Sequence, residues 1–520
     1  MSKALIIAEK PSVANDIARA LGGFTKHDEY FESDEFVLSS AVGHLLEIAA
    51  PEDYEVKRGK WSFANLPVIP PHFDLNPIAK SESRLKVLTK LLKRKDVDRL
   101  INACDAGREG ELIFRLIAQH AKAKQPVQRL WLQSMTPQAI RDGFANLRSD
   151  TDMQPLADAA RCRSEADWLV GINGTRAMTA FNSKGGGFFL TTVGRVQTPT
   201  LSIVVEREEK IRRFIPRDYW EVKAAFACAG GFYEGKWYDP KFKRDEFDPE
   251  KRDSRLWSLP AAETIVAACR DQVGTVSEES KPSTQLSPLL FDLTSLQREA
   301  NGRFGFSAKN TLGLAQALYE KHKVLTYPRT DARALPEDYI STVQSTLEML
   351  KESNNYLPHA KQVLDKGWVK PNKRIFDNSK ISDHFAIIPT LQAPKSLSEP
   401  EQKLYDLVVK RFLAVFFPAA EFRVTTRITE VAGHHFKTEG KVLVEPGWLQ
   451  VYGRDAEGAD ANLVPVQKNE KVKTDEIAAV ALVTKPPARY SEATLLSAME
   501  GAGKLVEDDE LREAMAAKGL

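Results

Sequence analysis

Two short apolar segments, each followed at once by charged residues and a helical pattern, constrain the fold of this chain most. The first, residues 3–8, precedes a helix that begins at Pro11 and stops at the pair Gly22-Gly23. The second, residues 100–104, follows a basic amphipathic helix after Lys80 and leads through the turn DAGREGE into another helix. Strands and helices that alternate at this spacing predict a parallel α/β sheet over roughly residues 1–150.

Later parts of the chain differ in pattern from this beginning. Helical patterns dominate residues 151–215, broken by the triplet Gly185–Gly187 and the turn-rich TTVGRVQTPT. Alternating, aromatic-rich segments after Pro216 and again at 421–452 are typical of strands. These two segments predict one β-rich domain, interrupted by a mostly helical insertion at about 285–390.

The composition excludes several classes of protein. With 520 residues, 42% of them hydrophobic and 28% charged, the chain has enough apolar material for several globular domains and is neither disordered nor fibrous. Lys plus Arg number 73 against 71 acidic residues, so nucleic-acid binding would depend on local clusters of charge. The four cysteines are too scattered for disulfides or a zinc finger, and no apolar run approaches the roughly 18 residues of a membrane span. We expect a cytoplasmic protein without a signal peptide.

Carboxylates follow both of the constraining strands. Glu9 and Asp105 each come at the C-terminal end of a predicted parallel strand, the edge where open α/β sheets bind ligands. Oxygen ligands of this kind suit Mg²⁺. Glu109 and Glu111 lie just beyond, and an equally good explanation is that they favour the positive end of the following helix. The usual glycine-rich nucleotide-binding signatures are absent, which disfavours a Rossmann oxidoreductase or a P-loop ATPase.

A tyrosine in the segment KHKVLTYPRTDAR is a candidate nucleophile. Tyr327 precedes a proline, which favours extended backbone and would put Tyr327, Arg329 and Asp331 on one face. A phenol with a pKa of about 10 needs activation, and a guanidinium two residues away could stabilise both the phenolate and a developing phosphoryl charge. Taken alone, the segment is more simply explained by a buried tyrosine beside an Arg-Asp pair.

Two further segments carry polar side chains suited to phosphate. GRVQTPT, residues 194–200, offers Arg, Gln and Thr donors on a turn, and SDHFAIIPT places His384 beside an acidic residue. A lone histidine is more often structural than catalytic, and the basic helix after Lys80 is more often a solvated face than a phosphate site. Neither segment alone identifies a function.

Together these segments resemble the type IA DNA topoisomerases, most closely the bacterial topoisomerase III members. The resemblance runs from Lys3 to about Leu511. It is carried, in this order, by AEKPS, DAGREGE, GRVQTPTL, LTYPRTD and PPARYSEATLL, which begin at residues 8, 105, 194, 325 and 486. It implies a multidomain fold of α/β, α and β parts, in which a parallel α/β Toprim domain joins a padlock-shaped core around a central hole.

The resemblance also implies a division of the chain into domains. Residues 1–150 would form the Toprim domain and 285–390 the domain of the catalytic tyrosine. A helical DNA-binding domain would comprise 151–215 and 480–520, and a β-rich hinge or arch 216–284 and 391–479. The charged segment at about 238–255 is similar in placement to a decatenation loop.

By the same resemblance, Tyr327 attacks a phosphodiester of single-stranded DNA and becomes joined to the 5′ phosphate. Another strand then passes through the gap before the free 3′ hydroxyl reseals it. Glu9 would serve acid/base chemistry, Lys10 would contact the scissile phosphate and Arg329 would stabilise the transition state. We expect a monomer that relaxes negatively supercoiled DNA and decatenates DNA without ATP, because the phosphotyrosine stores the bond energy.

The family's cofactor and DNA contacts can be carried over in the same way. Mg²⁺ would bind to Glu9, Asp105 and Glu109. The residues that the resemblance assigns to DNA binding are Arg176, Gly194, Arg195, Val196, Gln197, Thr198, Pro199 and His384.

Two departures from the family pattern bear on activity. The Asp-x-Asp-x-Glu pattern of a Toprim domain has Gly107 at its second aspartate position, and we expect Gly107→Asp to tighten the dependence on Mg²⁺. The sequence stops at Leu520, before a Gly-Thr-Pro-Ala-Thr-Arg-like segment and without a zinc ribbon, so weaker DNA binding and poor decatenation are expected. Two alternatives stay open: another Toprim enzyme, a primase or nuclease, and a DNA-binding protein without turnover.

Overall fold

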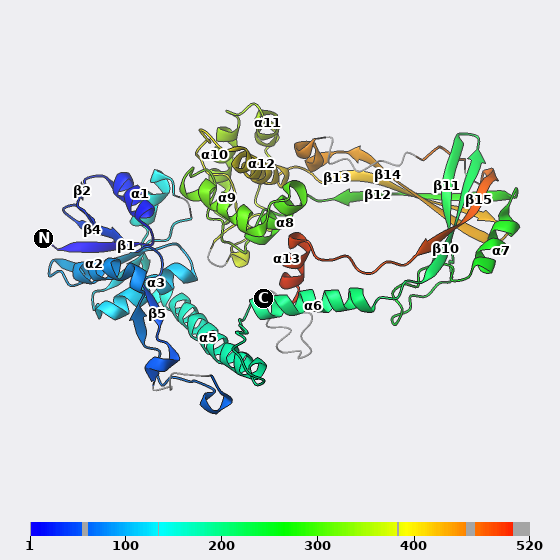
Figure 1. Ribbon diagram of the computed structural model, residues 1–520. Helices are drawn as coiled ribbons and strands as arrows, with labels where there is room; N and C mark the ends of the chain where they lie inside the picture. The colour runs from blue at the N-terminus through cyan, green and yellow to red at the C-terminus, as the bar shows by residue number, and fades with distance from the viewer. Residues whose placement is uncertain are drawn as a thin grey trace.

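The computed structural model describes residues 2–54, 61–133, 135–381, 384–453, 463–467 and 469–502. Figure 1 shows an α/β region at the N-terminal end, a helical region beside it and a β-barrel at the far end of the molecule. The barrel is joined to the rest by helix α6 (Gln197–Arg213), by strands β12 (Val273–Gln285) and β13 (Ala420–Val431), and by the segment that follows the last strand of the barrel. No helix among the described residues is long and apolar enough to cross a membrane.

The sheet region, residues 3–149, is built on a seven-stranded sheet with the strand order β2-β3-β4-β1-β7-β8-β9. Its parallel strands are β1 (Lys3–Ala8), β4 (Phe36–Ser40), β7 (Val97–Ala103) and β8 (Val127–Arg129). Its edges are extended by the antiparallel strands β2 (Thr25–Lys26), β3 (Phe31–Glu32) and β9 (Arg148–Ser149). The predicted parallel sheet is present at the centre, while the edges are mixed.

Helices cover both faces of this sheet. Successive residues of a strand point to opposite faces, so neighbouring residues of β1 belong to two different apolar cores. Leu5 and Ile7 of β1 belong to one apolar core, which includes α2 (Glu82–Leu92) and α3 (Arg108–Ala121). Ile6 belongs to the other, which includes α1 (Pro11–Leu21) and α4 (Pro137–Ala145). Burial on both faces explains why the central strands have continuous apolar sequences. A separate two-stranded sheet is formed by β5 (Leu46–Ile48) and β6 (Leu75–Pro77).

Two long helices lead away from the sheet region. The first, α5 (Asp150–Asn182), runs for 33 residues. The second, α6, begins at Gln197, so the end of the segment expected to be a turn forms the first helical turn instead. The reason is local: the Thr198 amide donates to the Gly194 carbonyl at 3.1 Å, and Pro199 is tolerated because the first turn of a helix does not need its amide.

The barrel closes from six antiparallel strands in the order β10-β11-β14-β13-β12-β15. Besides β12 and β13, these strands are β10 (Asp218–Cys228), β11 (Gly231–Tyr238), β14 (His434–Glu445) and β15 (Lys471–Val483). Helix α7 (Leu259–Cys269) contributes Ile265 and Cys269 to the apolar core of the barrel. The chain leaves the barrel after β12 and re-enters it at β13.

Between β12 and β13 lies the helical region, residues 286–419. It contains α8 (Leu293–Phe304), α9 (Ala308–Glu320), α10 (Ile340–Leu350), α11 (Leu357–Asp365) and α12 (Glu399–Ala414). Leu404, Val408 and Phe412 of α12 are fully buried in its core. A domain boundary at residue 390 would assign α12 to the β-rich part, which the structure corrects: apolar residues four apart give α12 a helical face that packs inside the helical region.

The last described helix, α13 (Glu492–Glu500), returns the chain from the barrel to the helical region (Figure 1). Glu500 accepts a hydrogen bond from Arg298 of α8 at 2.7 Å. Just before this helix, the Ala488 carbonyl accepts from Arg207 of α6, also at 2.7 Å. The segment therefore ties α6 to α8.

Candidate active site

The first part of the site is a pair of adjacent strand ends in the sheet region. β1 and β7 are parallel with Ala8 opposite Ala103, so Glu9 and Asp105 follow the two strands at the same edge of the sheet. The Asp105 amide donates to Oε2 of Glu9 at 3.2 Å. The structure thus brings these two side chains together, as their positions at the strand ends predict.

Both carboxyl groups carry raised pKa values. Burial raises the pKa of Glu9, and the charge of Asp105 raises it further. Burial also raises the pKa of Asp105, although Lys10 opposes this shift. The Lys10 ammonium lies 3.4 Å from Oδ2 of Asp105 and 2.7 Å from Oε1 of Glu320, at the end of α9. Two buried like charges are costly, so this edge of the sheet favours a bound cation.

The pair fits a hard divalent cation. Mg²⁺ is commonly held by one or two carboxylates together with water and substrate phosphates. Glu109, the third predicted ligand, is directed elsewhere: its side chain is 66% exposed, and its Oε2 lies 3.2 Å from Nε2 of His44. No group of three or more potential metal ligands is assembled in the parts of the chain that the structure describes. The donor set that fits is therefore Glu9 with Asp105.

Two glycines shape the turn DAGREGE between β7 and α3. Gly107 has φ +150°, a backbone conformation that L side chains rarely adopt. A side chain introduced by Gly107→Asp would strain the turn, and the expectation that this variant tightens the dependence on Mg²⁺ stays a prediction. At Gly110, an added Cβ would lie 2.0 Å from the Asp105 carbonyl oxygen. Glycine at these positions lets α3 begin directly behind the Asp105 backbone.

A buried arginine braces the same strand ends. Arg129, at the end of β8 and 1% exposed, donates to the carbonyl oxygens of Cys104 and Asp105, each at 2.7 Å. Its Nε lies 3.2 Å from Oε2 of Glu111, which is also 1% exposed. Glu111 therefore neutralises a buried cation rather than facing a ligand. This pair fixes the backbone that carries Asp105.

Tyr327 lies against this edge of the sheet although it belongs to the helical region. Its amide donates to the Gln133 carbonyl at 3.2 Å. Its ring packs edge-on against Tyr319, with the centroids 5.3 Å apart. Burial raises the pKa of Tyr327, the charges of Asp105 and Glu9 raise it further, and Arg329 opposes the shift. The phenol is thus close enough to both carboxylates for their charges to act on it.

Arg329 differs from its neighbour in being exposed. Its Nη2 lies 3.5 Å from Oε1 of Gln316, which is a long hydrogen bond. Among the described residues no carboxylate forms an ion pair with it. The guanidinium can therefore turn toward an incoming anion without losing an ion pair.

His384 stacks on the ring of Tyr327, with the centroids 4.2 Å apart. Trp131 of the sheet region stacks with the same imidazole at 5.7 Å. The Nε2 of His384 donates to the Ala106 carbonyl, whereas its buried Nδ1 has no hydrogen-bond partner among the described residues. Burial lowers the pKa of His384 to about 4, so the ring is neutral at physiological pH. In this arrangement it fixes the tyrosine ring and offers no positive charge to a phosphate.

The predicted DNA-binding loop, residues 194–199, lies at the start of α6 and is largely exposed. The Nε of Arg195 lies 2.6 Å from Oδ1 of Asp167 on α5. A groove of about 730 Å³ runs between the two helices; it is lined by Arg163, Asp167, Gly171, Val193, Gly194, Arg195, Val196, Gln197, Thr200, Leu201 and Val204. The loop is therefore open to a ligand on the side that faces α5.

Arg176 is placed differently from the loop. It is buried on α5, and its Nη2 lies 2.7 Å from Oε1 of Glu52 in the sheet region. Its guanidinium also lies 5.2 Å from the centre of the Trp61 ring. In this conformation Arg176 joins α5 to the sheet region, and its predicted contact with DNA would require it to leave Glu52.

Sequence reasoning did not identify three residues of the site: Arg129, Trp131 and Glu320. Arg129 ends a short strand, and a charged residue there gives no sign that it is buried. Glu320 closes α9 seven positions before Tyr327, where an acidic residue could equally be solvated. Their roles depend on contacts between distant segments, such as the 310 residues that separate Lys10 from Glu320.

Comparisons with known proteins agree with this geometry. The family described as DNA topoisomerase matches residues 151–504, and the Toprim domain matches residues 4–135. The chain is 42% identical to DNA topoisomerase 3 of Bacillus cereus over 518 residues, which are 98% of this chain and 68% of that protein. It is 40% identical to DNA topoisomerase 3 of Bacillus subtilis over 523 residues, with 98% and 69% covered.

A solved structure shares the fold. Full-length topoisomerase I from Thermotoga maritima superposes with a TM-score of 0.67 at 23% identity, covering 96% of this chain and 75% of that one. With the Toprim match over the sheet region, this confirms the expected fold class of a Toprim domain joined to a type IA core. The chain belongs to the type IA DNA topoisomerases, the isomerases that cleave and rejoin single strands of DNA.

Proposed function

We propose that Tyr327 cleaves single-stranded DNA and becomes joined to the 5′ phosphate, so that the enzyme relaxes negatively supercoiled DNA and decatenates DNA. The observation that carries this proposal is the position of the Tyr327 phenol beside the charges of Glu9 and Asp105, although it comes from a different region of the chain. A Toprim nuclease or primase would have no use for a tyrosine at this place. A DNA-binding protein without turnover would need neither the phenol nor the carboxylates.

The reaction exchanges one phosphate ester for another. As the Tyr327 oxygen bonds to phosphorus, the bond to the 3′ oxygen breaks; the phenol loses a proton and the 3′ oxygen gains one. Glu9 and Asp105 have raised pKa values and interact with one another, which suits them to take up one proton and return one. Since the new ester conserves the energy of the old one, resealing needs no ATP.

The positive groups of the site act on the phosphate. Lys10 exchanges its contact with Glu320 for a contact with the scissile phosphate, and Arg329 supplies a planar fork to the oxygens that gain charge. Mg²⁺ bound to Glu9 and Asp105 would add neutralising charge beside the phosphate. Loss of any one of these cations raises the barrier because the others cannot reach the same oxygen.

The remaining predicted residues bind or position. The loop of residues 194–199 holds the strand through its exposed donors, with Arg195 leaving Asp167 for a phosphate. His384 keeps the Tyr327 ring in place. Arg176 would contact DNA only after parting from Glu52. We further propose that the enzyme works as a monomer in the cytoplasm.

The test is a covalent adduct assay with a single-stranded oligonucleotide labelled at either end. A 5′-phosphotyrosine carries the 3′-label into a protein-bound band, whereas the 5′-label appears in a shortened free strand. Tyr327→Phe should abolish the adduct and leave single-strand binding nearly unchanged. Tyr319→Phe, which removes a neighbouring phenol 5.3 Å away, is the matched control and should still form it. An adduct in the Tyr327→Phe enzyme, or a protein-bound 5′-label, would exclude the mechanism.

A further inference from the structure

A row of lysines lies on the Toprim domain away from the residues described so far. We call it the lysine strip: Lys90, Lys93, Lys95, Lys122 and Lys124. The first three come from the end of α2 and the turn after it, and the last two from the connection between α3 and β8. All five are exposed. The strip includes the end of the basic helix after Lys80, to which the topoisomerase mechanism assigns no role.

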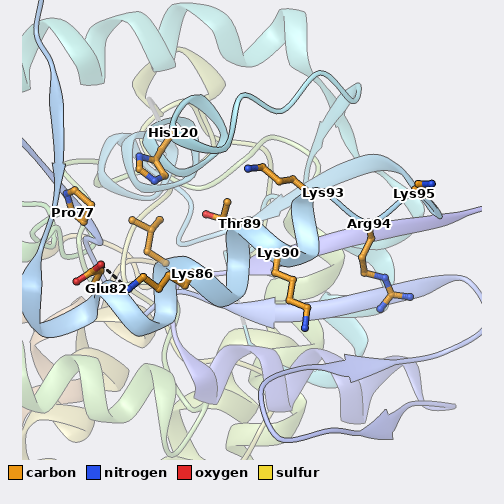
Figure 2. A pocket seen from close by; sticks show the side chains of 10 residues that line it. Pro77, Glu82, Lys86, Thr89, Lys90, Lys93, Arg94, Lys95 and His120 are labelled. Atoms are coloured by element: carbon orange, nitrogen blue, oxygen red, sulfur yellow. Dashed lines mark ion pairs between the residues drawn. The ribbon is translucent and has the colours of Figure 1, made fainter.

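The strip lines two adjoining hollows. One, of about 720 Å³, is lined by Pro77, Glu82, Leu85, Lys86, Thr89, Lys90, Lys93, Arg94, Lys95 and His120 (Figure 2). The second, of about 440 Å³, is lined by Leu92, Lys93, Asp98, Ala121, Lys122, Ala123, Lys124, Gln125 and Pro126. Lys93 lines both, so the two hollows lie side by side on the same surface.

The lysines of the strip meet few carboxylates: Glu82, which pairs with Lys86, lines the first hollow, and Asp98 lines the second. Neighbouring cations of the same domain are paired: Lys86 lies 2.8 Å from Glu82, and Arg94 lies 2.7 Å from Glu32 and 2.6 Å from Asp96. None of the five lysines forms an ion pair with a carboxylate in the described parts of the chain. Because the whole chain has a net charge of only +2, this concentration of unpaired positive charge is a local feature.

One member of the strip occupies an unfavourable backbone conformation. Lys122 caps the C-terminal end of α3 with φ 56°, in the left-handed region that favours glycine. Side chains other than glycine adopt that conformation at a cost, because Cβ approaches the following carbonyl oxygen. A lysine at this position therefore adds charge to the strip at the expense of stability.

The strip faces away from the cleavage site. Lys93 and Lys95 immediately precede β7, and Lys122 and Lys124 precede β8, so they lie at the amino ends of parallel strands. Asp105 lies beyond the carboxyl end of β7. At about 3.3 Å per residue, the seven residues of β7 separate the two edges by roughly 20 Å. A ligand on the strip is therefore not the phosphate that Tyr327 attacks.

The kind of side chain indicates the kind of ligand. Protein interfaces are enriched in Trp, Tyr and Arg and depleted in Lys. Single-stranded nucleic acids are held by stacking on aromatic rings, and of the described residues that line the two hollows His120 alone has an aromatic ring. Flexible ammonium groups with few aromatic neighbours suit the phosphates of a duplex, which they contact without reading the sequence.

We propose that the lysine strip is an accessory binding surface for the phosphate backbone of duplex DNA, distinct from the strand that is cleaved. It holds a flanking or second duplex on the outer edge of the Toprim domain while the active site acts on a single strand. The proposal does not depend on the roles assigned to Tyr327 or Glu9, and duplex binding without cleavage tests it.

The experiment compares two triple variants of the full chain by fluorescence anisotropy on a blunt duplex of about 30 base pairs. The strip variant is Lys90→Gln with Lys93→Gln and Lys124→Gln. The control, Lys361→Gln with Lys373→Gln and Lys403→Gln, changes the net charge equally at exposed lysines of the helical region that pair with Asp365, Glu337 and Glu399. Three lost phosphate contacts should lower the slope of log affinity against log salt by about 2.7 and duplex affinity at least about tenfold.

Three results decide the matter. The proposal is supported if the strip variant alone loses duplex affinity and has a smaller slope of log affinity against log salt. Its cleavage of a short single strand should stay within about twofold of the parent. Equal duplex binding by both variants overturns the proposal. The lysines would then serve to stabilise the negative C-terminal ends of α2 and α3. Loss of polyglutamate binding in the strip variant with unchanged duplex binding also overturns the proposal, in favour of an acidic protein partner.

Discussion

The proposed cleavage centre and the predicted DNA-binding loop differ in almost every physical respect. Glu9, Asp105 and Tyr327 lie in a largely buried setting where each raises the pKa of a neighbour. The loop of residues 194–199 is exposed, and its Arg195 pairs with an Asp167 that is itself 43% exposed. Charges in the first setting interact strongly, whereas in the second they are screened by water.

The difference indicates how each region acts. A buried cluster keeps its geometry before DNA arrives, and its raised pKa values suit the proton transfer proposed for it. An exposed loop exchanges one weak ion pair for another and gains affinity from several small contacts. We therefore expect changes at the cleavage centre to affect rate or stability by large factors, and changes in the loop to affect binding by small ones.

The largest effect should come from Glu9→Gln. Removing the proton-transfer group should slow covalent adduct formation by about 10²–10⁴, with single-strand binding retained. Glu109→Gln is the control within the same domain, because its exposed carboxylate contacts His44 instead. Single-turnover adduct formation measures both. Equal losses in the two variants would place Glu109 in the cleavage centre and remove the distinction between the two glutamates.

A second large effect should appear in stability. Arg129→Ala removes the buried donor of the Cys104 and Asp105 carbonyls and leaves the buried Glu111 with Arg115, 2.8 Å away, as its ion-pair partner, so it should lower the free energy of unfolding by about 3–5 kcal/mol. Arg19→Ala, which removes an 80% exposed arginine 3.9 Å from Asp16, should cost less than about 1 kcal/mol. Urea denaturation followed by circular dichroism compares them. A small loss for Arg129→Ala would mean that the strand ends are not braced by this pair.

The pH dependence of stability tests whether His384 belongs to the same buried setting as Glu9, Asp105 and Tyr327. The pKa of His384 is about 4 in the folded chain, below its ordinary value of 6.5, so the folded state resists protonation. The contribution of neutral His384 to the free energy of unfolding is complete above pH 6.5 and is lost as the pH falls toward 4. Between pH 7 and pH 5 the loss should be about 2 kcal/mol. His384→Gln should lack this part of the pH dependence, and identical profiles would show that the ring is accessible to protons.

The smallest effect should come from the loop. Arg195→Ala should weaken binding of a short single strand by a few-fold, corresponding to about 1 kcal/mol, and leave the cleavage rate at saturating DNA unchanged. Arg161→Ala on α5, whose partner is the exposed Asp158, is the control and should not alter binding. Filter binding and single-turnover cleavage separate affinity from rate. A rate loss as large as that of Glu9→Gln would make the loop part of the cleavage centre.

The sequence predicts the central sheet and the meeting of Glu9 with Asp105 because both depend on local signals. Apolar runs identify β1 and β7, and parallel strands bring their carboxyl ends to one edge. The start of α6 is harder to predict, because proline and threonine favour turns as well as the first turn of a helix. The assignment of α12 needs the packing of distant segments, since its own pattern shows only that it is helical.

The orientation of charged side chains is the least predictable part of the site. Glu109 and Glu111 share one helical turn, yet one contacts His44 at the surface and the other pairs with the buried Arg129. Helical spacing puts them on different faces, but the partner of each comes from another strand or loop. Burial of Arg129 likewise depends on the whole sheet. Sequence motifs therefore locate the site, but they do not distinguish residues that bind a ligand from residues that stabilise the fold around it.

The contact between the Toprim domain and the helical region combines ion pairs with a few aromatic rings. Lys10 bonds to Glu320, and Lys323 lies 2.6 Å from Asp16. The rings of Tyr319 and Tyr327 pack against the apolar core of the sheet region, and Trp131 stacks with His384. When two surfaces of this kind part, hydration replaces each bond at a net cost of only about 1 kcal/mol, whereas an apolar surface would lose about 25 cal/mol for every Å² exposed. On the proposed mechanism, the two regions can part with the severed DNA ends and return to register without the disruption of an extended hydrophobic core.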